Sequence, residues 1–190
     1  SIYSDNISYD LSIFKNIKKL RLYSCNNITN INCLKKLEEV CISYCNNISN
    51  VEILGKCSKV KLASCVRLID VSPLKDVYDL NLKCSYNINN FETLTNVVIL
   101  NVSNTNINNE QLKFLKNIKN LNISNFKNIT DITSLKYSKL DILNISANRI
   151  NKLPIIKSLR KLIFRYPKSW ILNLISIKFM TNLKYIDFTE

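Results

Sequence analysis

The sequence repeats its aliphatic residues every twenty positions. The first aliphatic residue of five successive units is Leu20, Val40, Val60, Leu80 and Leu100. A second aliphatic residue follows two positions later, and a small or thiol-bearing residue five positions later. A fixed period of this length is typical of a solenoid, in which identical structural units stack on one another. The chain is therefore predicted to present an extended surface rather than one cleft.

Each unit combines two periodicities. The two aliphatic residues alternate with other residues, which predicts a short strand with one buried face. Aliphatic residues then follow at steps of three, as at Ile28, Ile31 and Leu34, and predict a tight return leg. Twenty residues leave room in that leg for extended chain and one turn of 3₁₀ helix, and hardly for an α-helix.

The units after Leu100 are less regular and mostly longer. We therefore expect the return legs of the C-terminal half to be more helical. Around Leu112 the spacing predicts one or two real helical turns. Near the end, Ser169 is a candidate cap for a helix from Trp170 to about Met180.

The repeat resembles the leucine-rich repeat family, on segments such as L-x-x-V-x-I-x-x-C over 37–45 and L-x-x-L-x-I-x-x-N over 140–148. The short units are similar to the SDS22-like and internalin-like classes. The resemblance implies an α/β solenoid, a leucine-rich repeat with a parallel concave β-sheet and short 3₁₀, extended or helical return legs. It covers residues 1–190 as a single solenoid of about eight to nine units. We expect this solenoid to be part of a longer chain, because both ends cut a repeat and no polar cap is evident.

One position of the unit departs from the family pattern. The position five residues after the first aliphatic usually holds Asn or Cys, which hydrogen-bonds the backbone at the turn after the strand, and here it holds Ser85, Thr105, Phe126 and Pro167 in four units. Asn148 fits this role, and Cys25, Cys45 and Cys65 recur there as small buried side chains. Phe126 cannot make such a bond, so a local change of turn is expected there.

The resemblance implies a non-catalytic module that binds a protein partner through the concave sheet. Strand alternation directs one set of side chains to that face, and the candidate partner-binding residues are Arg21, Tyr23, Lys59, Lys61, Asn81, Asn101, Asn122, Asn144 and Arg165. Candidate aromatic anchors are Tyr23 and Tyr44 at one end and Tyr166 and Trp170 at the other. The neutral centre, where Ser103, Ser124 and Ser146 accompany the asparagines, is either a hydrogen-bonding floor or simply a soluble surface.

A second surface supports an alternative function. The net charge is +13, and lysine recurs after the third aliphatic residue of six return legs, at Lys15, Lys35, Lys75, Lys116, Lys136 and Lys157. Such a ridge suits nucleic acid or an anionic membrane. Against this, the ridge lacks the interleaved arginines and aromatic residues that nucleic-acid sites favour. A third possibility is a structural segment of a larger protein.

Catalysis and cofactor binding have no support in the sequence. There is no histidine, no Gly-rich phosphate loop and no recurring pair of carboxylates, so we expect no enzyme activity and no small-molecule substrate. The seven cysteines include no C-x-x-C pair, so no metal or cofactor is expected. Reduced thiols would place the protein inside the cell, in the cytoplasm.

Overall fold

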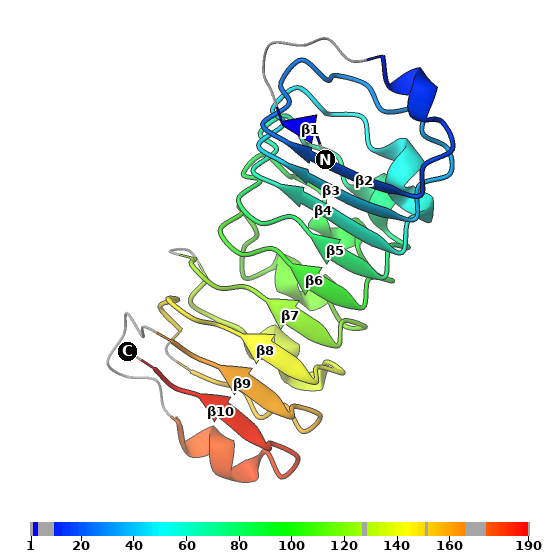
Figure 1. The fold of residues 1–190 in the computed structure, drawn as a ribbon. Coiled ribbons are helices and arrows are strands. Elements are labelled where there is room, and N and C mark those ends of the chain that lie inside the picture. The colour runs from blue at the N-terminus through cyan, green and yellow to red at the C-terminus, as the bar shows by residue number, and fades with distance from the viewer. Residues whose placement is uncertain (1, 4–9, 127–128, 151, 166–173, 190) are drawn as a thin grey trace.

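The computed structural model describes residues 2–3, 10–126, 129–150, 152–165 and 174–189. Ten parallel strands form one sheet in which the spatial order follows the sequence order, from β1 to β10 (Figure 1). Every strand pairs with the one from the next repeat, and 3₁₀ helices lie on the return legs. The predicted α/β solenoid with a parallel sheet is therefore confirmed.

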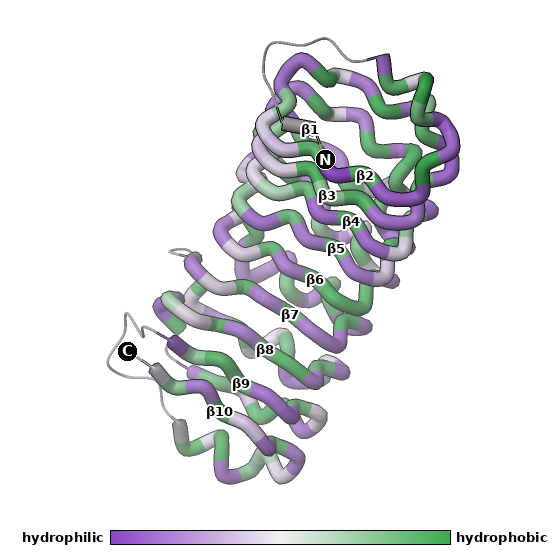
Figure 2. The backbone as a smooth tube through the Cα atoms, viewed as in Figure 1, coloured by the Kyte–Doolittle hydropathy of each residue, from purple (hydrophilic) through white to green (hydrophobic). Residues whose placement is uncertain are grey.

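The strands are short. Their bounds are β1 Ile2–Tyr3, β2 Lys19–Tyr23, β3 Glu39–Ser43, β4 Lys59–Ala63, β5 Asp79–Asn81, β6 Ile99–Asn101, β7 Asn120–Asn122, β8 Ile142–Asn144, β9 Lys161–Ile163 and β10 Tyr185–Asp187. The twenty-residue period is the register of the sheet, because Leu20 pairs with Val40 and Leu80 pairs with Leu100. Figure 2 shows the hydrophobic positions recurring from strand to strand, as this register requires.

The helices are short 3₁₀ segments of 3–6 residues on the return legs. They are η1 Leu11–Phe14, η2 Glu52–Lys56, η3 Ser72–Leu74, η4 Phe91–Thr93, η5 Gln111–Phe114, η6 Thr133–Tyr137 and η7 Leu174–Phe179. Each helix from η1 to η6 has one buried residue, and around η2 the buried residues Val51, Leu54 and Cys57 follow at steps of three, which matches three residues per 3₁₀ turn. Many legs begin with an Asx turn: the side chains of Asp10, Asn30, Asn50, Asp70 and Asp131 accept the N–H two residues on at 2.7–3.0 Å.

The C-terminal return legs are only slightly more helical than the N-terminal ones. The helices η5 to η7 have 4–6 residues, against 3–5 in η1 to η4. The helical turn predicted around Leu112 is present as η5, which is a single 3₁₀ turn. Of the helix predicted from Trp170 to Met180, the described part is η7, while Ser169 and Trp170 lie outside the described residues.

The turns after β2 to β8 repeat as faithfully as the strands. One residue per turn has a left-handed backbone with φ between 53° and 63°: Ser24, Tyr44, Ser64, Cys84, Asn104, Asn125 and Ala147. None is glycine, the residue that adopts this conformation most readily. Asn125 precedes Phe126 and has a φ in the same range as the others, so no change of turn is seen up to Phe126, while residues 127 and 128 lie outside the described residues.

A ladder of small polar side chains joins successive turns. The N–H of Cys25 donates to Sγ of Cys45 at 3.3 Å, and the N–H of Cys65 donates to Oγ of Ser85 at 3.2 Å. The turn at Phe126 is completed from the next unit, because its N–H donates to Oδ1 of Asn148 at 2.7 Å. A side chain in one unit thus satisfies the backbone of the unit before it, and Phe126 needs no polar group of its own.

The thiols divide into a buried and a half-buried set, and all seven are free. Cys25, Cys45, Cys57 and Cys65 are buried, as predicted for three of them. Burial raises the pKa of Cys57 to about 11 and that of Cys65 to about 12, from the ordinary value of 9.0. These side chains pack as small neutral groups in the folded protein.

We therefore predict that alkylation of the native protein will stop at the half-buried set, Cys33, Cys41 and Cys84. Mass spectrometry after brief iodoacetamide treatment measures this, with the unfolded protein as control. Rapid labelling of Cys65 in the native protein would contradict the packing.

The free energy of unfolding should also fall as the pH rises above about 9, because unfolded thiols lose protons that Cys57 and Cys65 keep when folded.

Candidate functional site

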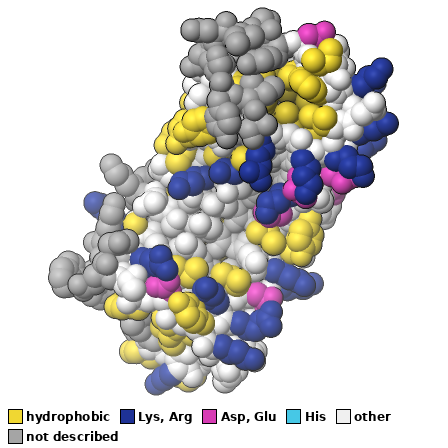
Figure 3. Space-filling model, in the orientation of Figure 1, with side chains coloured by type: hydrophobic (Ala, Val, Ile, Leu, Met, Phe, Trp, Pro, Cys, Tyr) yellow, Lys and Arg dark blue, Asp and Glu magenta, His cyan; other side chains and the backbone are white. Residues whose placement is uncertain are grey.

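The outward-facing side chains of the sheet form one continuous column. Register partners run along it from Arg21, Cys41 and Lys61 to four asparagines: Asn81, Asn101, Asn122 and Asn144. All of these residues except exposed Arg21 are half-buried. Figure 3 shows the consequence, with charged side chains towards the two ends of this face and an uncharged stretch across its centre.

The four asparagines end their strands. The Oδ1 atoms of Asn81, Asn101, Asn122 and Asn144 each accept the backbone N–H two residues on, at 2.9–3.0 Å. This local bond takes the N–H that would otherwise extend the ladder. Strands β5 to β8 have three residues, whereas β2 to β4, which lack asparagine there, have five; β9 and β10 also have three residues, without an asparagine.

The same bonds decide what the asparagines offer to a ligand. A backbone N–H can only donate, so the side-chain atom of each asparagine that faces it must be the oxygen Oδ1. The Nδ2 group of the same side chain then remains as a hydrogen-bond donor. These Nδ2 groups have no partner among the described residues. The asparagine column is thus both structural and a row of hydrogen-bond donors.

The serines predicted to share this floor are mostly buried. Ser103 is 2% exposed and Ser124 is 9% exposed. Their short side chains follow directly after the asparagine turn, where the chain bends towards the interior. The prediction of an open Asn/Ser stripe is therefore wrong in its serine half, although Ser146 is half-buried.

A hollow of about 530 Å³ lies over the N-terminal half of the face. We call it the concave hollow; the side chains that matter for its chemistry are Arg21, Tyr23, Tyr44, Lys61, Asn81, Lys83 and Asn101. Five of the nine predicted partner-binding residues are therefore brought together. None of the described residues that line the hollow is acidic.

The nearest carboxylates are already paired with other lysines. Glu39 bonds Lys19 at 2.8 Å, and Asp79 bonds Lys59 at 2.7 Å. The hydrogen bond from Lys19 lowers the pKa of Glu39, and the bond to Asp79 raises the pKa of Lys59. Lys59 was predicted to bind a partner, and the structure shows its charge engaged within the sheet.

The three cations that line the concave hollow differ from Lys19 and Lys59 in their pairing. Arg21, Lys61 and Lys83 have no ion-pair partner among the described residues. Lys83 was not among the predicted binding residues. Its position two residues after Asn81, at the same place in the unit as Tyr23, was the signal in the sequence that could have identified it.

Two tyrosines stand beside these cations. Tyr23 and Tyr44 are half exposed, and their ring centroids are 5.3 Å apart at an interplanar angle of 64°. This edge-to-face contact is favourable and holds both rings in place. Both were predicted as anchors and both line the hollow, whereas Tyr166 and Trp170 lie outside the described residues.

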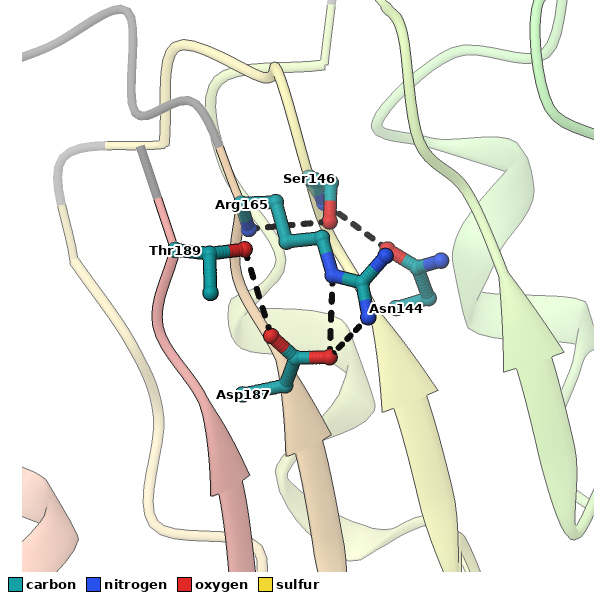
Figure 4. Close-up of polar contacts among 5 residues, drawn as sticks. All are labelled: Asn144, Ser146, Arg165, Asp187 and Thr189. Carbon is teal, nitrogen blue, oxygen red and sulfur yellow. Dashed lines mark hydrogen bonds and ion pairs between the residues drawn. The ribbon is translucent and has the colours of Figure 1, made fainter.

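At the C-terminal end of the face, the positive charge of Arg165 is paired with a carboxylate of the same chain (Figure 4). Arg165 forms an ion pair with Asp187, which is 7% exposed, through Nη2 and through Nε at 2.9 Å. Its backbone N–H donates to Oγ of Ser146 at 3.0 Å. The hydrogen bond from Arg165 lowers the pKa of Asp187. Arg165 thus joins the last two strands, apart from the concave hollow.

The lysine ridge is exposed on the return legs, as predicted. Its interruption at Gly55 has a steric cause, because a Cβ there would lie 2.3 Å from the carbonyl oxygen of Pro73. The described residues contain no group of three or more potential metal ligands. In the same part of the chain, no helix is long and apolar enough to cross a membrane.

No protein-family model matches the sequence, and the search of curated proteins gives no match. Solved structures do match. Internalin C2 of Listeria monocytogenes has a TM-score of 0.67 at 19% identity, over 94% of this chain and 84% of that one. The TLR13–ssRNA13 complex gives 0.63 at 20% identity, over 94% of this chain and 29% of that one.

A third solved structure also matches this chain. The functional domain of InlJ from Listeria monocytogenes, described as including a cysteine ladder, has a TM-score of 0.53 at 18% identity, over 96% of this chain and 46% of that one. In this chain the stacked Cys25, Cys45 and Cys65 occupy successive turns. These likenesses concern the fold alone, and they confirm the architecture that the sequence predicts.

Proposed function

We propose that this leucine-rich-repeat solenoid is a binding module that holds a protein partner through its concave sheet and takes the partner's acidic side chains into the concave hollow. The observation that carries the proposal is the chemistry of the lining. Arg21, Lys61 and Lys83 supply unpaired positive charge. Asn81 and Asn101 add amide donors, because their oxygens are bonded to the backbone.

A lining of cations and amide donors suits a ligand rich in acceptors and negative charge. Carboxylates of aspartate and glutamate meet both conditions, and charge-assisted hydrogen bonds to them are the stronger kind. Tyr23 and Tyr44 add half-exposed rings of the type that dominates protein interfaces. The concave hollow can therefore contribute both electrostatic selection and apolar contact area.

The charge distribution favours a protein over a nucleic acid on this face. A nucleic acid carries one phosphate per nucleotide and is bound by a track of cations. Beyond the concave hollow the column continues with Asn122 and Asn144, which are neutral, and Arg165 is paired with Asp187. Along that column successive phosphates would meet no cation, although Lys161 and Lys184 lie around a second hollow beside it, whereas a compact acidic patch of a protein needs no such track.

The test uses a fluorescent oligoglutamate peptide as the probe. We predict that it binds at low salt and that the double variant R21E/K61E weakens binding by at least about tenfold, because like charges then face the carboxylates. The matched control is K35E/K75E on the return legs, which changes the net charge equally. Fluorescence anisotropy measures both affinities.

Two results would contradict the proposal. If K35E/K75E weakens binding as much as R21E/K61E, the peptide responds to net charge and the concave hollow is not its site. If single-stranded RNA binds more tightly than the peptide and R21E/K61E abolishes that binding, the face is a nucleic-acid site instead.

A further inference from the structure

Three return-leg helices of the C-terminal half end in an exposed aromatic residue that follows a lysine. They are η5 with Lys113 and Phe114, η6 with Lys136 and Tyr137, and η7 with Lys178 and Phe179. The rings are 40%, 86% and 51% exposed. Each lysine Nζ lies 4.9–5.2 Å from its neighbour's ring centroid. We call these six residues the basic-aromatic face.

The lysine column itself holds no aromatic residue, as the sequence indicates, but exposed aromatic residues lie next to it. The aromatic residues sit beside the ridge lysines Lys116 and Lys136, on the helical ends of the legs rather than in the lysine column itself. The carboxylates nearest in sequence to η5 and η6 are Glu110, Asp131 and Asp141. Asp141 is paired with Arg160 at 2.8 Å. Asp131 already accepts the N–H of Thr133 at 2.7 Å. Positive charge therefore dominates where the rings are exposed.

An apolar hollow of about 380 Å³ lies in the same region. Leu153, Pro154, Ile155, Ile175 and Phe179 line it, with Lys136 and Lys152 also in its lining. Ile175 is 61% exposed, so water covers an aliphatic side chain beside two ammonium groups. An apolar floor with cations beside it is complementary to the interfacial layer of a bilayer, where acyl chains meet anionic head groups.

We propose that the basic-aromatic face docks on anionic lipid bilayers as a peripheral contact. Lysines near such a surface are attracted to anionic lipid, and their long stems lie along apolar material while the ammonium groups reach the head groups. Aromatic rings are enriched at the same depth. The aliphatic hollow distinguishes this surface from a nucleic-acid site, where arginines and stacking rings line the groove. Because this face lies on the return legs, it leaves the concave sheet available (Figure 1).

The test is flotation of the 190-residue chain with vesicles of phosphatidylcholine alone and of phosphatidylcholine mixed with phosphatidylserine. We expect flotation only with the anionic vesicles, weakening as salt is added. The variant K136Q/K178Q should lower partitioning by about fivefold for each lysine removed. The variant F114A/F179A should also lower it without changing the net charge, which separates insertion from simple attraction.

The matched control is K15Q/K35Q, which removes two ridge lysines at the N-terminal end. It should retain most of the binding, and circular dichroism should show that every variant is folded. No flotation with anionic vesicles at low salt would overturn the proposal. So would equal losses in K15Q/K35Q and K136Q/K178Q, or unchanged binding in F114A/F179A. Since R21E/K61E leaves this face intact, failure of the concave site and failure of this one are distinguishable.

Discussion

Replacing Asn148 with alanine is expected to lower the free energy of unfolding by about 3 kcal/mol, the largest effect we predict for a single side chain. Asn148 is fully buried and bonds two backbone groups of the preceding unit. Its Oδ1 accepts the N–H of Phe126 at 2.7 Å, and its Nδ2 donates to the carbonyl of Ile123 at 2.6 Å. Alanine would leave both groups buried without a partner, and each such group costs about 1–3 kcal/mol.

Urea denaturation followed by circular dichroism measures this loss. The matched control is Asn117→Ala, since Asn117 is exposed and makes one bond, from Nδ2 to the carbonyl of Thr95 at 3.0 Å. Its loss should stay within about 0.5 kcal/mol, as for other surface substitutions. Equal losses in the two variants would mean that water or a shifted backbone satisfies the turn at Phe126, and the ladder would not have the role described above.

Replacing Gly55 with alanine should destabilise the protein by about 2 kcal/mol, although alanine is the better helix former. Gly55 lies in η2, and a Cβ there would sit 2.3 Å from the carbonyl oxygen and 3.4 Å from the carbonyl carbon of Pro73 in η3. The obstacle is backbone, so two stacked return legs must move apart. Overpacking of this kind costs about 1–3 kcal/mol.

Thermal unfolding of Gly55→Ala and of Lys75→Ala provides the comparison. Lys75 occupies the same position one unit later and is exposed, so its replacement should change stability by no more than about 0.5 kcal/mol. A gain in stability for Gly55→Ala would show that helix propensity outweighs the contact and that the return legs are more loosely stacked. The same contact explains why the lysine ridge is interrupted at this unit.

The repeat pattern predicted part of the concave hollow, but not which of its neighbouring charges are paired. Strand alternation correctly assigned Arg21, Tyr23, Lys61, Asn81 and Asn101 to one face, and the structure groups them around one hollow. It did not reveal that Lys59 pairs with Asp79 or that Arg165 pairs with Asp187. Those pairs join residues 20 and 22 positions apart, and they depend on which side chains reach across the sheet.

The sequence by itself determined the solenoid, the register of the sheet and the face on which each column lies. It could do so because each unit contacts only its neighbours at a nearly constant offset, so the repeat period in the sequence is also the register between stacked units. Only the tertiary structure decided which polar groups remain available. The asparagine oxygens, the serines and Lys59 are engaged or buried by neighbours, while Arg21, Lys61 and Lys83 have no ion-pair partner among the described residues. Hydrogen bonding and burial are settled by side-chain geometry between units, which the period does not encode.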